Sequence, residues 1–429
     1  MNIKEIVIFL IVLFSVYFLG NFYIYKRSVQ ALSLDGRYLN YYRTLFLLIV
    51  LCYPIAKIGT GFFGPFFLSK QLNIVGSIFM GVMLYCLLLL LLVDIVRLFN
   101  YFIHFFPDII TKNKIMAGRV AFCVFFFIIF CVAAYGVINA KYLRVIEQKI
   151  ILDKLKPEHN GFTIVQISDI HLGDIINEKF VHKVVEKANS LNPDIVVITG
   201  DLIDDGGSDL KQLSPLAHLK SKFGTYFVSG NHDNFFRIRP AAIPSNAPST
   251  LPSDNLNDTD STKKSSADAT EKKDSTTVNR NSFLSTPLAA ILKEMDIKIL
   301  HNEYLVIDSA FTLFGLDYRF GRRGNTDSGT IIKQLEGYNK ELPLIMLKHV
   351  PNDLDNIADA GVDLILCGHT HHGQMFPLTL ITDKVYEISN GYGKYKSLQV
   401  YVNCGTGFWG PPVKVGVPAE ITKIVLYRE

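Results

Sequence analysis

Long apolar stretches dominate the first 140 residues, whereas short apolar runs alternate with amphipathic segments in the rest of the chain. Three of these stretches have about the 20 residues that a helix needs to cross the hydrocarbon core of a bilayer. A further one is shorter and contains Pro54, which membrane helices tolerate. The pattern predicts an α-helical membrane segment of about four spans within residues 1–140, at residues 6–24, 45–58 (reaching on through 62–68), 74–96 and 120–138.

Residues 141–429 show the pattern of a separate α/β domain. Short β-branched runs predict strands, and the segments between them have helical periodicity, as at 177–191 and 211–222. Continuous apolar strands that alternate with helices indicate a covered, largely parallel sheet. We expect strands at 141–152, 162–168, 194–199, 225–229, 311–316, 344–347, 362–367 and 399–403.

One segment of this domain has a different composition. Residues 241–282 are rich in Ser, Thr, Asp, Asn and Lys and contain few aliphatic side chains. Such a segment cannot bury enough apolar surface to offset the entropy lost on ordering. We therefore expect a disordered surface insertion within the domain.

Charge is distributed unevenly along the chain. Residues 1–140 carry 11 basic and 4 acidic residues, so the net charge of +4 belongs to the apolar part, and residues 141–429 carry a net −3. Basic residues that flank apolar spans favour a membrane protein, and the negative balance of the C-terminal domain argues against nucleic acid as a partner.

The orientation in the cell membrane follows from the loop charges, because basic loops stay in the cytoplasm. The predicted second loop carries fewer charges, Lys57 and Lys70, although Lys141, Arg144 and Lys149 after the last span point the other way. The balance favours a multi-pass protein with an extracytoplasmic C-terminal domain. The basic residues that decide this are Lys26, Arg27, Arg37 and Arg43 in the first loop and Arg97, Lys112, Lys114 and Arg119 in the third.

Polar side chains that can bind metal follow five of the predicted strands. Because ligand sites in open α/β sheets form beyond the carboxyl ends of the strands, these side chains should converge. Carboxylate, amide and imidazole groups suit first-row divalent ions. Seven candidates exceed the needs of one ion and fit two ions that share a carboxylate, a pair that generates hydroxide near neutral pH. The polar residues at these strand ends, seven of which are counted as candidate ligands, are Asp169, His171, Asp201, Asp204, Asn231, His232, His349, His369 and His371.

The order of these motifs resembles the calcineurin-like metallophosphoesterase superfamily. The succession is Asp-x-His, Gly-Asp-x-x-Asp, Gly-Asn-His-Asp, a lone His, and Gly-His-x-His. Residues 368–374 and 405–412 are similar to a membrane-associated bacterial branch that includes UDP-2,3-diacylglucosamine hydrolases. The resemblance covers residues 141–429 and implies a β-sandwich flanked by helices that holds two divalent ions, either Mn, Fe or Zn.

The resemblance also implies a role for each residue. Asp169, His171 and His371 hold the first ion, whereas Asn231, His349 and His369 hold the second, and Asp201 bridges them. His232 is the catalytic histidine and is oriented by Asp204. Two residues depart from the pattern of the branch, because His372 stands in place of a glycine and Tyr318 in place of an acidic residue.

These observations predict a membrane-anchored two-metal phosphoesterase. It would hydrolyse a phosphodiester or pyrophosphate by metal-bound hydroxide, with a lipid or a nucleotide-linked glycolipid as a candidate substrate. Alternatives are a phosphoprotein phosphatase, a nuclease, or a membrane sensor or scaffold without catalysis. The intact set of ligands and His232 argue against the last of these.

Overall fold

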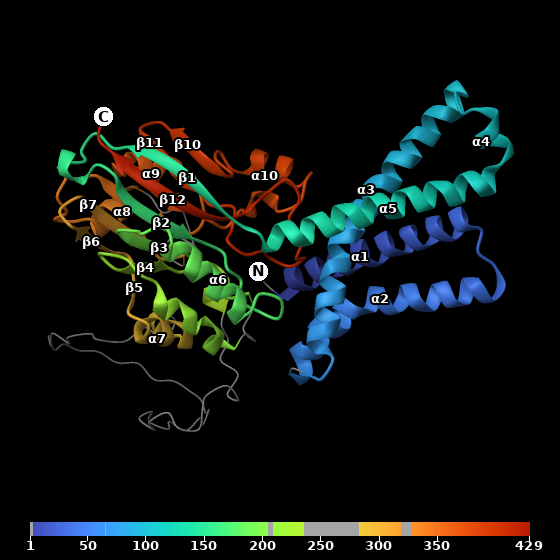
Figure 1. Ribbon diagram of the computed structural model, residues 1–429, viewed down its shortest axis with the longest axis horizontal. Coiled ribbons are helices and arrows are strands. Elements are labelled where there is room, and N and C mark those ends of the chain that lie inside the picture. Colours follow the sequence, from blue (N-terminus) through green and yellow to red (C-terminus); the bar gives the residue numbers. More distant parts are fainter. Residues whose placement is uncertain (1–2, 65, 205–208, 236–282, 319–327) are drawn as a thin grey trace, which may run out of the picture.

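The computed structural model describes residues 3–64, 66–204, 209–235, 283–318 and 328–429 (Figure 1). The predicted insertion at 241–282 lies outside the described residues. A bundle of long helices precedes a C-terminal domain of two β-sheets with helices on their outer faces (Figure 1). Helix α5 ends at Lys141 and strand β1 begins at Leu143, so one residue separates the two parts.

Four long helices and one short helix form the N-terminal part. Three of them, α2, α3 and α5, are long and apolar enough to cross a membrane. The first expected span falls on α1, which is 30 residues long and lies beside α3 and α5, and its crossing stays a prediction. The bounds are α1 Ile3–Leu32, α2 Gly36–Phe63, α3 Ser69–Ile103, α4 Asp108–Lys112 and α5 Lys114–Lys141.

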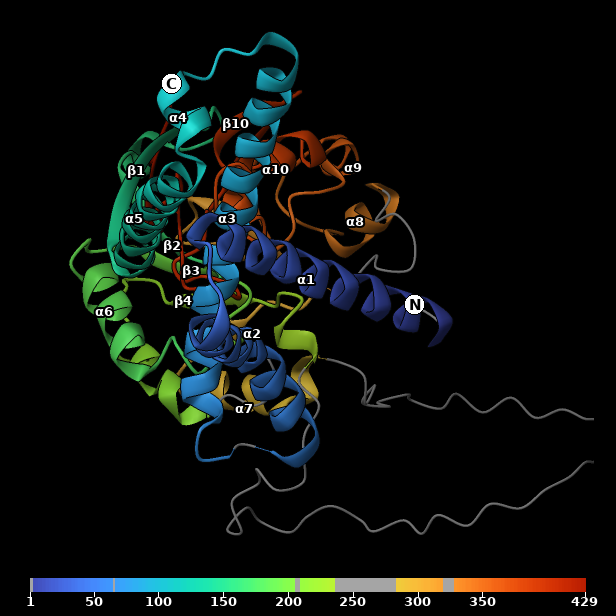
Figure 2. The ribbon, with the colours of Figure 1, turned by 90° about the vertical axis from the view of Figure 1, so that its right-hand side faces the viewer.

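The second span was expected to be short, but α2 continues through Pro54 to Phe63. Lys57, which the sequence placed in a loop, therefore lies inside this helix. The α1–α2 turn and the α3–α5 connection lie at the end of the bundle that points away from the C-terminal domain (Figure 1). Figure 2 views the molecule from that end and shows α4 above the helices.

The backbones of helices α2 and α3 come into contact at Gly76. A Cβ atom at Gly76 of α3 would lie 2.4 Å from the backbone nitrogen of Tyr53 in α2. Small residues allow such an approach in membranes, where close van der Waals packing replaces the hydrophobic effect between helices. This contact sets the position of α2 along α3, and so determines which residues of α2 face the C-terminal domain.

The C-terminal domain contains two six-stranded sheets within the described residues. The first has the order β1-β12-β2-β3-β4-β5, and its strands β2 to β5 are parallel. The second has the order β10-β11-β9-β8-β7-β6 and is parallel from β11 to β7. The strands are β1 Leu143–Ile151, β2 Phe162–Ile167, β3 Ile195–Thr199, β4 Thr225–Val228, β5 Ile297–Ile299, β6 Glu303–Ile307, β7 Phe311–Leu316, β8 Leu344–Lys348, β9 Leu364–Cys367, β10 Gly391–Tyr395, β11 Leu398–Val402 and β12 Ala419–Tyr427.

Three apolar layers hold these sheets together. Side chains such as Ile164 and Leu347 fill the space between the two sheets, as in a β-sandwich. Val184 of α6 and Leu288 of α7 cover the first sheet, and Ile357 of α9 covers the second. The predicted β-sandwich flanked by helices is therefore confirmed. The α-helices of this domain are α6 Glu178–Asn189, α7 Pro287–Glu294, α8 Ser328–Gln334, α9 Leu354–Asp359 and α10 Thr379–Val385.

The structure corrects part of the predicted element pattern. The helix expected at 211–222 is a 3₁₀ helix, Leu210–His218, and Pro215 inside it has no N–H group to continue an α-helical ladder. Strand β12 was not predicted, although it lies between β1 and β2 and is largely buried. Strands β5, β6 and β10 were also missed.

A loop at residues 404–418 joins the two parts of the molecule. Asn139 of α5 donates hydrogen bonds to the carbonyl oxygens of Lys414 and Val417, at 3.0 and 2.7 Å. The buried ammonium of Lys414 donates to the carbonyls of Cys404, Gly405 and Pro418. Buried hydrogen bonds therefore hold the end of α5 and this loop together.

The α2–α3 contact gives a first prediction. Gly76→Ala places a methyl group against the Tyr53 backbone and should destabilise the protein by about 1–3 kcal/mol, the usual cost of overpacking. Thermal unfolding in detergent micelles measures this. Gly61→Ala in α2 is the matched control, because nothing lies within 4 Å of a Cβ there. Equal unfolding temperatures for both variants would contradict the packing.

Candidate metal centre

All the predicted ligands lie at the carboxyl ends of parallel strands. Asp169 and His171 follow β2, Asp201 follows β3, and Asn231 follows β4 of the first sheet. In the second sheet, His349 follows β8, and His369 and His371 follow β9. The two sheets thus contribute to one locus at a shared edge of the sandwich, as the positions of the motifs predicted.

The backbone at these strand ends is unusual. Asp169, His171, Asp201, His369 and His371 all have φ values between 45° and 73°. Side chains other than glycine rarely adopt this left-handed region, and such strain gathers at functional sites. The left-handed residues turn each strand end sharply, so that successive side chains point into the same small volume.

Two glycines make this crowding possible. A Cβ atom at Gly230 would lie 2.1 Å from Oδ1 of Asp201, and one at Gly368 would lie 2.2 Å from Oδ2 of Asp169. No side chain fits at such distances. Glycine is therefore required at both positions by the close approach of the carboxylates.

The first ligand group consists of Asp169, His171 and His371. The two Nε2 atoms lie 3.0 Å apart. Oδ1 of Asp169 lies 3.4 Å from Nε2 of His371 and 3.8 Å from Nε2 of His171. Three atoms that carry lone pairs thus converge on one point, which is the arrangement that a divalent cation requires.

The second group consists of Asp201, His349 and His369. Nε2 of His349 lies 3.1 Å from Oδ2 of Asp201, 3.1 Å from Oδ1 of Asn231 and 3.3 Å from Nδ1 of His369. The same Oδ2 of Asp201 is 3.9 Å from Nε2 of His171 in the first group. One carboxylate oxygen therefore faces both groups.

Electrostatics prepare the groups for metal. Burial opposes ionisation of Asp201, but His349 and His171 outweigh it and lower its pKa to about 2. Burial lowers the pKa of His171 to about 3 and that of His369 to about 4, so both rings are neutral at pH 7. Burial also opposes the charged form of His349, yet Asp201 and Asp169 raise its pKa to about 9, so this ring is protonated at pH 7 and has to release the proton on Nε2 before it can bind an ion.

Surrounding groups fix the orientation of the ligands. Nδ1 of His349 lies 2.7 Å from the carbonyl oxygen of Thr199. Because a carbonyl can only accept, Nδ1 carries the proton and Nε2 is aimed into the site. Asp233 accepts hydrogen bonds from the backbone nitrogens of Asp201, Leu202 and Gly230 and so ties two strand ends together.

The surroundings of His171 and His371 also indicate that the first group fits a divalent ion. The Nε2 atoms of His171 and His371 lie 3.0 Å apart and meet the Asp169 carboxylate rather than a separate hydrogen-bond donor. A cation between these three atoms would accept a lone pair from each, and the donor set of oxygen and imidazole nitrogen suits Mn, Fe or Zn.

The predicted catalytic pair is adjacent to the first group. His232 is partly exposed, and its ring lies 4.8 Å from that of His171. Its Nδ1 makes a short hydrogen bond to the carbonyl oxygen of Asp204, whereas the carboxylate of Asp204 is 3.9 Å away. Asp204 therefore contacts His232 directly through its main chain, which the sequence could not reveal.

Of the two residues that depart from the family pattern, His372 points away from the ligand groups and Tyr318 lies beside them. His372 points to α10, where its Nε2 is 3.0 Å from Oδ1 of Asp383, so it does not enter the ligand groups. Tyr318 lies at the edge of the site, with its ring 6.4 Å from that of His349. The substitution at 318 therefore changes a wall of the site, whereas the one at 372 does not.

Sequence reasoning missed two residues near the site. Gln374 holds the loop beside His232, since its side chain bonds the main chain of Trp409 and Pro411. Lys57 of α2 lies with its Nζ 4.0 Å from Oδ2 of Asp204. A lone lysine in an apolar stretch was the available signal, but only the fold shows what it faces.

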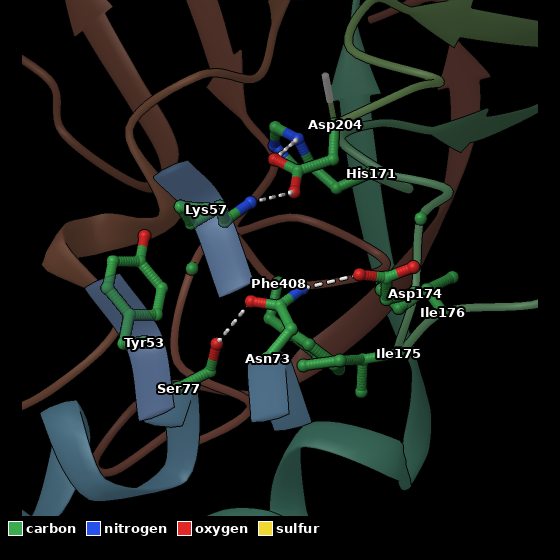
Figure 3. Close-up of a pocket in the computed structure, with 12 residues that line it drawn as sticks. Tyr53, Lys57, Asn73, Ser77, His171, Asp174, Ile175, Ile176, Asp204 and Phe408 are labelled. Atoms are coloured by element: carbon green, nitrogen blue, oxygen red, sulfur yellow. Dashed lines mark hydrogen bonds and ion pairs between the residues drawn. The ribbon is translucent and has the colours of Figure 1, made fainter. Parts of the chain in front are cut away.

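A pocket lies between the helices and the metal centre (Figure 3). Its lining residues border about 340 Å³ of empty space, which includes space open to solvent. Tyr53, Lys57, Asn73 and Ser77 of α2 and α3 form one wall (Figure 3). The opposite wall is formed by residues of the C-terminal domain, among them His171, Asp174, Asp204 and Phe408.

Comparison with known proteins agrees with this geometry. Residues 162–373 match the family model of the calcineurin-like phosphoesterases. The C-terminal domain is a calcineurin-like metallophosphoesterase domain. Membership of this family implies divalent metal ions and a phosphoester substrate for the domain.

Several curated relatives share the domain. An uncharacterized metallophosphoesterase of Helicobacter pylori is 30% identical over 286 residues, which cover 66% of this chain and 64% of that protein. A transmembrane protein with metallophosphoesterase domain of Danio rerio is 30% identical and covers 68% of this chain and 60% of that protein. A UDP-2,3-diacylglucosamine pyrophosphatase of Chlamydia trachomatis is 28% identical, with 62% and 84% covered. The chain thus matches less than two thirds of the first two relatives.

The shared carboxylate gives a second prediction. Asp201→Asn replaces an anionic ligand that faces both groups, so the purified variant should retain less than half of the manganese bound by the wild type. Elemental analysis after dialysis measures this, and phosphoesterase activity should fall with the metal. Asp153→Asn, at an exposed position, is the control. Full metal content in Asp201→Asn would show that this carboxylate binds neither ion.

Proposed function

We propose that the protein is a membrane-anchored two-metal phosphoesterase that hydrolyses a phosphodiester or pyrophosphate. The observation that carries this proposal is the position of Asp201 between two ligand groups, each with its own histidines. When bound, two divalent ions at such a site supply a nucleophilic hydroxide near neutral pH and neutralise charge on the phosphoryl oxygens.

His232 is assigned as the proton donor to the leaving oxygen. The carbonyl of Asp204 accepts from Nδ1 and so leaves Nε2 as the nitrogen that exchanges a proton with substrate. The carboxylate of Asp204, 3.9 Å away, stabilises the charged ring. Trp409 lies beside His232, with the two ring centroids 6.4 Å apart.

A lipid-linked substrate is supported by the position of the pocket. Its walls combine residues of α2, which can cross a membrane, with residues of the metal centre. The chlamydial relative is named for a nucleotide-linked glycolipid, and a substrate of that class would bring a phosphate to the bilayer surface. A phosphoprotein phosphatase is the alternative, whereas the net −3 of residues 141–429 disfavours a nuclease.

The extracytoplasmic orientation is supported by where the basic residues lie. The α1–α2 turn, α4 and the connection from α3 to α5 lie at the end of the helix bundle away from the C-terminal domain (Figure 1). By their positions in the chain, Arg27, Arg37, Lys112 and Arg119 stand next to these connections. Lys57, counted among the opposing charges, is engaged with Asp204 and is not a loop residue. The positive-inside rule then places the far end in the cytoplasm. A nucleotide-linked lipid precursor made in the cytoplasm would favour the opposite orientation.

The third prediction separates proton transfer from metal binding. His232→Ala should keep its metal and lower kcat by about 10²–10⁴-fold for an alkyl phosphodiester. The loss should be smaller for bis(4-nitrophenyl) phosphate, because its leaving group needs little protonation. His182→Ala, on the exposed face of α6, is the control. An equal loss for both esters would rule out the acid role.

The fourth prediction concerns orientation. Alkaline phosphatase, which is active only after export, should be active when fused to Glu429. The same reporter fused after Lys112, between α4 and α5, should be silent, and a fluorescent protein that matures in the cytoplasm should be bright there. The reverse pattern at both positions would overturn the orientation.

A further inference from the structure

One cation of the helix bundle lies against the metal centre. Lys57 is the one charged residue between Arg43 and Lys70. A charged side chain in such an apolar stretch is expensive and usually has a functional partner. Here the Nζ atom points to the carboxylate of Asp204 (Figure 3).

The carboxylate of Asp204 connects this cation to the first ligand group. Its Oδ2 lies 4.0 Å from Nζ of Lys57, and its Oδ1 lies 3.9 Å from Nδ1 of His171. At 4.0 Å the contact is ionic rather than a hydrogen bond, which needs about 3.2 Å or less. The Asp204 carboxylate therefore lies between the ammonium of Lys57 and His171, a proposed metal ligand.

Lys57 is the group in the helical wall of the pocket that suits an anion. Asn73 donates to Asp174 at 2.7 Å, and Ser77 donates to Asn73. Those two side chains dock α3 onto the C-terminal domain. Of the residues that line the pocket, Lys57 alone is a lysine or arginine. An ammonium with three donors binds phosphate oxygens strongly.

The turn after α2 indicates the level of the bilayer surface. Phe62, Phe63 and Phe67 are 81%, 89% and 92% exposed. Aromatic side chains exposed in this way at a helix end favour the membrane interface. Lys57 precedes Phe63 by six residues, or roughly 9 Å along the helix axis. The pocket therefore lies close to the surface of the bilayer on the side of the C-terminal domain.

We propose that Lys57 is a substrate-binding residue, and that it binds the non-scissile phosphate of a lipid-linked pyrophosphate. The scissile phosphate occupies the metal centre, the second phosphate reaches the ammonium across the pocket, and the lipid tails stay in the bilayer. This inference rests on the proposed function. It makes α2 part of the active site rather than only an anchor.

The test uses full-length, manganese-loaded protein in nanodiscs. CDP-diacylglycerol serves as the lipid pyrophosphate, measured as substrate or as inhibitor of bis(4-nitrophenyl) phosphate hydrolysis. Lys57→Met should raise its KM or inhibition constant about 10–100-fold, the worth of a hydrogen bond to a charged group. Bis(4-nitrophenyl) phosphate has one phosphate and serves as the reference substrate, so its kcat/KM should fall by a factor about tenfold smaller than that for the lipid.

Control variants separate the proposal from simpler explanations. Lys70→Met removes a charge from the exposed start of α3 and should change neither substrate. Lys57→Gln should behave like Lys57→Met, and it replaces that variant if the latter unfolds. Metal content and unfolding temperature should match those of the wild type in every variant that is compared.

Four results would overturn the inference. Unchanged lipid binding in both Lys57 variants would show that Lys57 does not bind the substrate and only extends its ammonium to the membrane surface. An equal loss for both substrates would show that Lys57 acts on the metal centre through Asp204. Wild-type protein that hydrolyses bis(4-nitrophenyl) phosphate but does not bind the lipid would exclude this substrate class. Wild-type protein that hydrolyses neither compound refutes the proposed function itself, and the inference with it.

Discussion

The burial of carboxylates beside imidazoles is the constraint on which the rest of the structure depends. Asp169 and Asp201 are 0% and 2% exposed, and a buried charge is stable only when it is paired and hydrogen-bonded. The left-handed backbone at the strand ends and the close approach of Gly230 and Gly368 bring the pairs together. Asp233 then fixes two of the strand ends with backbone hydrogen bonds. The sheets, the turns at the strand ends and the glycines together place the partners that stabilise these buried carboxylates.

The loop at residues 404–418 extends this solution to the helix bundle. At one end, a Cβ at Gly405 would lie 2.6 Å from Nδ1 of His371. At the other, Val413 packs so closely that a Cβ at Gly136 of α5 would lie 2.4 Å from it. Lys414 bonds three carbonyls between these points. The metal centre and the helices are therefore joined by close contacts through this loop, as a site shared between them requires.

Much of the site could be predicted from the sequence, because each motif follows an apolar strand. Parallel strands end at one edge, so the convergence of Asp169, Asn231 and His349 follows from local pattern alone. The rest depends on contacts between distant segments. Strand β12 has a β-branched run, with Ile421, Thr422 and Val425, that was overlooked, and its place between β1 and β2 is set by distant segments. Lys57 was counted with the loop after the second span, whereas α2 continues to Phe63. No spacing in the sequence could show that this lysine meets Asp204, which is 147 residues away.

The central claim is that two ions share Asp201, and electron paramagnetic resonance of the manganese-loaded protein tests it most directly. Ions that share a carboxylate lie about 3.5–4 Å apart and couple magnetically. The account predicts two manganese ions per chain and a broad, exchange-coupled spectrum at low temperature. One ion per chain, or two ions that give the sharp six-line signal of isolated Mn²⁺, would contradict it.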